Sequence, residues 1–170
     1  MSIGQFLASY VATRELQLVP HARGETVQRE VYATRCVWDM LNTWEDTRLG
    51  QRHARARVHV DTFTEGLKIA VRFPPSKSIA AHTALLTERS EEVWEMRARD
   101  PSPGIRIFGR FLRKDRFVAL TWDYKENSET PEQYEYQKGR CSRAWSALFV
   151  SMLPYTGANV HEYVTNCIAV

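Results

Sequence analysis

Alternating apolar and polar residues predict three consecutive strands in the middle of the chain. They are Val93 to Arg99, Ile105 to Leu112 and Phe117 to Tyr124, each rich in Val, Ile, Phe or Trp. The connections between them, Asp100 to Gly104 and Arg113 to Arg116, are only four or five residues long. Connections this short join antiparallel neighbours, because a parallel pair needs a crossover of a dozen or more residues. The pattern therefore predicts a three-stranded antiparallel meander.

Further periodic patterns precede the meander. Apolar residues at helical spacing predict helices over Ser2 to Leu18 and Glu25 to Glu45. The stretch RHARARVHV, residues 52–60, alternates apolar and cationic residues, as does Gly66 to Phe73, so these two segments are predicted to pair as strands. Ser76 is placed to cap a helix that runs through Thr87.

After the meander, Thr130 and Pro131 form the favoured start of a helix over Glu132 to Met152, and the tail from Ala158 to Val170 predicts a final strand. The fold class predicted from these elements is α+β. An antiparallel meander sheet of about five to six strands packs against three to four helices. Residues 1–170 are expected to form a single domain, with an N-terminal helical part over 1–50 and a sheet-and-helix core over 52–150.

Composition and charge leave several classes of partner open. Hydrophobic residues make up 44% and charged residues 25%, as in ordinary globular proteins. The net charge is +3 and arginine outnumbers lysine, which is compatible with an RNA or an acidic protein partner and equally with a GC-rich genome. The sequence contains no apolar run long enough to span a membrane and no signal-peptide pattern, so we expect a cytoplasmic protein with no membrane partner.

Five arginines are predicted to contact nucleic acid or a protein partner. They are Arg55, Arg57, Arg97, Arg99 and Arg110, all on predicted strands. The alternative is that they line a solvated sheet face. No metal site and no cofactor are expected, because His53 and His59 are far apart on one predicted strand and have no carboxylate beside them.

The order of four motifs, WEMR, GIRIFGRF, FVALTWDYK and TPEQYEYQKGR, resembles the RelE/HigB superfamily of toxins (the RelE/ParE superfamily). The resemblance covers about Val93 to Phe149, about a third of the chain. It implies a RelE-like fold, here with an N-terminal extension, in which the meander sheet cradles RNA. It also implies ribosome-associated mRNA cleavage or, in the ParE branch, binding to DNA gyrase without nuclease chemistry.

Cleavage of RNA by its own 2′-hydroxyl needs a base, cations that stabilise the phosphate and an acid for the leaving oxygen, but no metal. By the resemblance, Arg106 corresponds to the central-strand arginine that stabilises the phosphate. Lys125 would neutralise charge or act as base, and Tyr134 would stack on a base or transfer a proton. Glu126 departs from the family pattern, which has a second basic residue there, and a carboxylate beside the phosphate would repel the substrate.

Arg106 also has a structural interpretation. If Leu112 and Phe117 flank the turn directly, Arg106 lies opposite Asp123 and could form a surface ion pair worth under about 1 kcal/mol. Two functional hypotheses follow. The first is a metal-independent, toxin-like endoribonuclease that cleaves ribosome-associated mRNA and is neutralised by an antitoxin. The second is a non-enzymatic, phage-encoded or defence-related binding or inhibitor protein on the same scaffold, which engages a host protein or nucleic acid.

Overall fold

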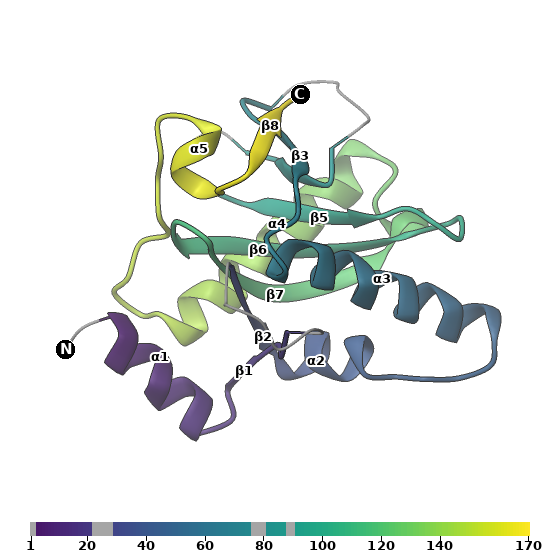
Figure 1. Ribbon diagram of the computed structural model, residues 1–170, viewed down its shortest axis with the longest axis horizontal. Helices are drawn as coiled ribbons and strands as arrows, with labels where there is room; N and C mark the ends of the chain where they lie inside the picture. The colour runs from purple at the N-terminus through teal and green to yellow at the C-terminus, as the bar shows by residue number, and fades with distance from the viewer. Residues whose placement is uncertain (1–2, 22–28, 76–80, 88–90) are drawn as a thin grey trace.

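The fold is organised around one sheet of eight strands (Figure 1). The computed structural model describes residues 3–21, 29–75, 81–87 and 91–170. Within these ranges the strands lie side by side in the order β1-β2-β7-β6-β5-β4-β3-β8. In chain order they are β1 (Leu16–Leu18), β2 (Glu30–Thr34), β3 (Ile69–Arg72), β4 (Thr83–Leu85), β5 (Trp94–Ala98), β6 (Ile105–Arg113), β7 (Arg116–Tyr124) and β8 (Cys167–Ala169).

The sheet is mixed, and this corrects the predicted fold class of a five- to six-stranded antiparallel meander with three to four helices. β2 runs parallel to β7, and β3 runs parallel to both β4 and β8. The described residues form eight strands and five α-helices. Three of the strands, β1, β4 and β8, have only three residues each, which is too short for an alternating pattern to reveal them.

The central meander is confirmed, because β5, β6 and β7 are antiparallel neighbours. Arg106 on β6 lies opposite Arg97 on β5 and opposite Asp123 on β7. Phe117 pairs with Phe111 and not with Leu112, but two irregularities in the β6–β7 pairing compensate one another, so Arg106 still lies opposite Asp123. The ion pair of Arg106 nevertheless goes to Glu95 and not to Asp123.

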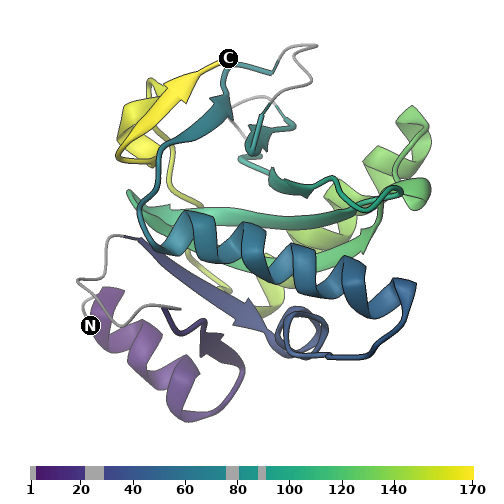
Figure 2. The same cartoon turned by 45° about the vertical axis from the view of Figure 1, so that its right-hand side comes forward.

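Helices cover both faces of the sheet (Figure 2). The helices α2 (Arg35–Leu41), α3 (Arg48–Thr64) and α5 (Val160–Tyr163) pack on one face, here the α3 face. The helices α1 (Ile3–Ala12) and α4 (Pro131–Leu148) pack on the other, the α4 face. Because both faces of the central strands are buried, charged side chains on them must be paired or held in a cavity.

The predicted strand over residues 52–60 is wrong, because this segment lies inside α3. The side chains of Arg52, Ala56, Val60 and Phe63 are buried at spacings of three and four residues, which form one stripe of a helix. Val58, which the alternating pattern placed with the apolar face, is 51% exposed. The alternation was local, whereas the helical stripe from Arg52 to Phe63 extends over about three turns.

The N-terminal assignments also change. The predicted helix Ser2 to Leu18 ends at Ala12, and its last residues form β1. The predicted helix over Glu25 to Glu45 becomes β2 followed by α2, and residues 22–28 lie outside the described residues. Three consecutive residues of β2 are buried, as expected for a strand covered on both faces. This continuous burial removes the alternation that would distinguish a strand from a helix.

The remaining elements agree in part with the prediction. Of the predicted helix Ser76 to Thr87, residues 76–80 lie outside the described residues, and β4 occupies its second half. The start of α4 is confirmed, with Thr130 as N-cap and Pro131 at the first turn, and the helix ends at Leu148. The final strand is confirmed as β8, after the short helix α5. None of the helices in the described ranges combines the length and apolarity needed to cross a membrane.

Candidate functional site

A cavity lies on the α4 face between β3, β5 and the first half of α4. It has a volume of about 250 Å³, and its described lining residues are Arg72, Leu86, Arg97, Tyr134 and Lys138. We call it the α4-face cavity. Three of these five side chains are cationic, so the cavity is suited to an anionic ligand.

Strand alternation brings the cations to this face. On β5, Met96 packs into the core of the α3 face, so its neighbours Glu95 and Arg97 point toward α4. Glu95 is fully buried and binds two arginines: Arg97 Nε donates to Oε1 at 2.5 Å, and Arg106 Nε lies 3.5 Å from Oε2. One carboxylate thus holds two cations that lie directly opposite each other on adjacent strands.

Arg72 and Lys138 add further positive charge. Arg72 comes from β3 and donates to the main-chain oxygen of Leu85 at 3.4 Å. Burial, and then the charge of Arg97, lower the pKa of Arg72, which reflects the crowding of cations in this region. Lys138 comes from α4 and forms an ion pair with Glu135, whose side chain is 70% exposed. Four cations lie in this region: Arg72, Arg97, Arg106 and Lys138. Glu95 and Glu135 together supply two negative charges, so an excess of positive charge remains.

Tyr134 brings an aromatic ring to the same cavity. It lies in the first turn of α4, which a capping box between Thr130 and Gln133 fixes in position. Burial raises the pKa of Tyr134, and so does the charge of Glu95, while Arg106 and Arg97 oppose this rise. The phenol is therefore protonated at neutral pH and can donate a hydrogen bond or a proton.

Lys125 and Glu126 do not line this cavity. Lys125 begins the short 3-10 helix η1 (Lys125–Asn127), where Nζ donates to the main-chain oxygen of Ser128 at 3.2 Å and lies 3.6 Å from Glu129. Glu126 forms a two-point contact with Arg52 of α3, at 3.2 and 2.8 Å. The hydrogen bond from Arg52 lowers the pKa of Glu126. The negative charge that departs from the family pattern is thus taken up by Arg52.

Two of the predicted contact arginines serve local packing. Arg57 donates to Asp61 at 2.9 Å and to the main-chain oxygen of Pro20 at 3.0 Å. Arg110 is buried, donates to Ser142 Oγ at 2.8 Å and lies over the ring of Trp145. These contacts join α3 and α4 to their neighbours and explain both cations without a ligand.

Arg55 and Arg99 belong to a different cavity on the α3 face. Its volume is about 380 Å³, and its lining includes the two histidines His59 and His82. The five predicted contact arginines are thus distributed over four regions. The predicted site residues that the structure brings together on the α4 face are Arg97, Arg106 and Tyr134.

Sequence reasoning missed Arg72, Lys138 and Glu95. Arg72 was visible as a cation at the polar position of the predicted strand Gly66 to Phe73. Glu95 was visible as the carboxylate in the strand motif WEMR. Lys138 had no such signal, because many polar residues follow one another at the start of α4.

Comparison of the chain with models of protein families, with curated proteins and with solved structures finds no match. Among the described residues, no three metal-ligating side chains come together. The features of the molecule that indicate a function are therefore the geometry and charge of the two cavities.

Proposed function

We propose that this protein binds single-stranded RNA, with a phosphate in the α4-face cavity and an unpaired base against Tyr134. The observation that carries the proposal is the convergence of Arg72, Arg97 and Lys138 with one aromatic ring in a single cavity. Arginine donates paired hydrogen bonds to phosphate oxygens, and an aromatic side chain stacks on unpaired bases. The resemblance to RNA-cleaving toxins supports RNA as the nucleic acid.

The geometry of Glu95 also supports a phosphate site. Glu95 is buried behind Arg97 and Arg106, and it accepts a hydrogen bond from Arg97. Its carboxylate fixes the orientation of the two guanidinium groups, which lowers the entropy cost when they bind a ligand. The excess positive charge then remains available to a phosphodiester in the cavity.

A matched pair of variants on α4 tests RNA binding. Lys138→Gln is expected to weaken binding about tenfold, because one charge-assisted contact to phosphate is lost. Arg143→Gln removes one cation from an exposed position of the same helix and should leave the affinity within about twofold. Fluorescence anisotropy with a labelled 12-nucleotide RNA, at two salt concentrations, measures both affinity and its salt dependence.

Equal losses in the two variants would show that the protein binds RNA through diffuse charge and not through this cavity. Arg72→Gln provides a second probe from the opposite wall of the cavity, on β3, and is expected to behave like Lys138→Gln. Circular dichroism of each variant separates a lost contact from a lost fold.

A second candidate function is cleavage of the bound RNA without a metal. Tyr134 favours it, because a protonated phenol beside cationic side chains is placed to protonate the leaving 5′-oxygen. Arg106 and Arg97 would stabilise the charge on the phosphate. Lys125 remains a proposed source of positive charge outside the cavity lining. An antitoxin with an acidic segment would be the matching protein partner.

Tyr134→Phe separates the two functions, because it keeps the ring and removes the proton. Binding should change less than about twofold, whereas cleavage should fall about 100-fold or more if the phenol is the acid. Primer extension on ribosome-bound mRNA locates and quantifies the cuts. Unchanged cleavage by the variant would exclude Tyr134 as the acid, and an uncut mRNA with the wild type would leave RNA binding as the proposed function.

A further inference from the structure

We propose that the cavity on the α3 face is a second site, which binds a small phosphomonoester of the nucleoside monophosphate class. We call it the histidine-pair cavity. It lies between α3, β3, β5 and the two residues that precede β4, and it has a volume of about 380 Å³, within the size range of small-molecule sites. This proposal does not depend on RNA binding at the α4-face cavity.

Two stacked imidazoles form one wall of the cavity. The rings of His59 and His82 are 3.5 Å apart and nearly parallel. His59 Nε2 lies 3.1 Å from the main-chain oxygen of His82, and His82 Nε2 lies 3.0 Å from that of His59. A carbonyl oxygen only accepts hydrogen bonds, so both Nε2 atoms carry the proton.

The same contacts leave one ring nitrogen of each histidine as an acceptor. His82 Nδ1 lies 2.9 Å from Thr83 Oγ1 and accepts from that hydroxyl. His59 Nδ1 is not enclosed, and it has no hydrogen-bond partner among the described residues. Burial lowers the pKa of His59 to about 4, so this nitrogen keeps its lone pair at neutral pH. His59, which lines the cavity, therefore carries an acceptor for an N–H or O–H group.

Cations lie around this acceptor. Arg55, Lys68 and Arg99 line the cavity and are exposed, and Asp100 is the carboxylate among the described lining residues. Arg99 is held in place by a hydrogen bond to the main-chain oxygen of Ala81, at 3.2 Å. The excess of positive charge fits a dianionic phosphate, which a phosphomonoester carries near neutral pH.

Apolar side chains complete the lining. Five apolar residues add surface to the lining beside the cations and the histidines: Val58, Ile69, Ala70, Ala81 and Ala98. A ligand that matches all three features has a phosphomonoester, a flat or apolar body and a donor group for His59 Nδ1. A nucleoside monophosphate combines them, since its base carries N–H donors on a planar ring. Inorganic phosphate can pair only with the cations. A free nucleoside can contact only the acceptor and the apolar surface.

The two cavities lie on opposite faces of the sheet, although Arg97 borders both. The Arg97 side chain is bound to Glu95 on the α4 face, whereas its main-chain N–H donates to His82 at the other cavity. A substitution of Lys138 should therefore leave the histidine-pair cavity unchanged. This separation lets an experiment distinguish the two proposals.

Isothermal titration calorimetry of the full chain with 5′-AMP, 5′-GMP, 5′-CMP and 5′-UMP tests the proposal. At least one is expected to bind with a dissociation constant below about 1 mM, and inorganic phosphate and the matching nucleoside about tenfold more weakly. Arg99→Gln and Lys68→Gln should each weaken the best ligand about tenfold. His59→Phe keeps a stacked ring but removes the acceptor, so it should weaken binding of the best ligand about fivefold.

Lys138→Gln and Arg35→Gln are the controls, and neither should change nucleotide affinity. Arg35 is an exposed cation of α2, with 83% of its side-chain surface accessible. Binding of none of the four nucleotides at 5 mM would overturn the proposal. Equal affinity for inorganic phosphate, or an unchanged affinity in both Arg99→Gln and Lys68→Gln, would overturn it as well. Chemical-shift changes at α3 and β4 amides in the wild type confirm the location without any variant.

Discussion

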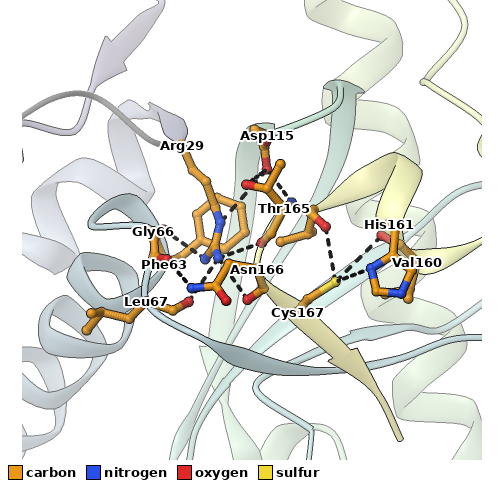
Figure 3. Close-up of polar contacts among 11 residues, drawn as sticks. Arg29, Phe63, Gly66, Leu67, Asp115, Val160, His161, Thr165, Asn166 and Cys167 are labelled. Atoms are coloured by element: carbon orange, nitrogen blue, oxygen red, sulfur yellow. Dashed lines mark hydrogen bonds and ion pairs between the residues drawn. The ribbon is translucent and has the colours of Figure 1, made fainter.

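Arg29→Met is expected to lower the free energy of unfolding by about 3 to 5 kcal/mol, because it removes four hydrogen bonds from a buried guanidinium group to main-chain oxygens. Arg29 precedes β2 and is fully buried. Its guanidinium group donates to four main-chain oxygens at 2.7 to 3.3 Å, those of Phe63, Leu67, Thr165 and Asn166 (Figure 3). Methionine has a similar length and is apolar, so it fills the space without replacing these bonds.

The position of these oxygens explains why the loss should be large. Phe63 lies in the last turn of α3, where carbonyl groups have no partner within the helix. Thr165 and Asn166 directly precede β8, and Asp115, which lies 3.8 Å from Arg29 Nε, also accepts from the Thr165 main-chain N–H. Arg29 thus joins the end of α3, the β6–β7 turn and the segment that leads into β8.

Urea unfolding followed by circular dichroism measures the effect, and the melting temperature should fall by about 6 to 20 °C. Arg35→Met, at an exposed position of α2, is the matched control and should change the stability by less than about 0.5 kcal/mol. Hydrogen exchange should also show lost protection in β8 amides. A stability within about 1 kcal/mol of the wild type would contradict this account of Arg29.

The sequence predicted the elements whose periodicity is long and local. The meander β5–β6–β7 was recognisable because β6 and β7 have nine residues each and short connections. The parallel pairs β2–β7 and β3–β8 were not, because each joins segments more than 80 residues apart in the chain. Local periodicity carries no information on such pairings, so the order of the strands in the sheet could not be predicted from it.

The candidate site shows the same limit. The sequence identified the meander cations but could not say which of them share a carboxylate, because that depends on strand register. Glu95 holds Arg97 and Arg106 on the α4 face, whereas Arg52 and Glu126 pair across α3 and η1. The histidine pair was hidden for a stronger reason. His59 was assigned to a strand, and it meets His82 only because α3 packs against β5, the neighbour of β4, which begins directly after His82.

The histidine pair also predicts a loss of stability in mild acid. Burial lowers the pKa of His59 to about 4 and that of His82 to about 2, from ordinary values near 6.5. In the unfolded chain both imidazoles take up a proton below pH 6.5, whereas in the folded protein they stay neutral. Their contribution to stability is therefore complete above pH 6.5 and is lost as the pH falls toward the folded values.

The charged groups around the pair reinforce this direction. The charges of Arg106 and Arg99 lower the pKa of His59 further, and that of Arg29 lowers the pKa of His82. The described lining of the cavity also contains Arg55, Lys68, Arg97 and one carboxylate, Asp100. Between pH 7 and pH 4.5 each histidine is expected to reduce the free energy of unfolding by about 2 kcal/mol. Protonation would also place like charges on two rings in van der Waals contact.

Urea unfolding of the wild type and His59→Phe at pH 7, 6, 5 and 4.5 measures this contribution. Carboxylates affect both proteins alike, so the difference between the two curves isolates the imidazole. The wild type should lose about 2 kcal/mol more than His59→Phe over this interval, since the variant takes up about one proton fewer on unfolding. Parallel curves would mean that His59 is protonated in the folded protein as readily as in the unfolded chain, and the neutral acceptor of the histidine-pair cavity would then be lost in mild acid.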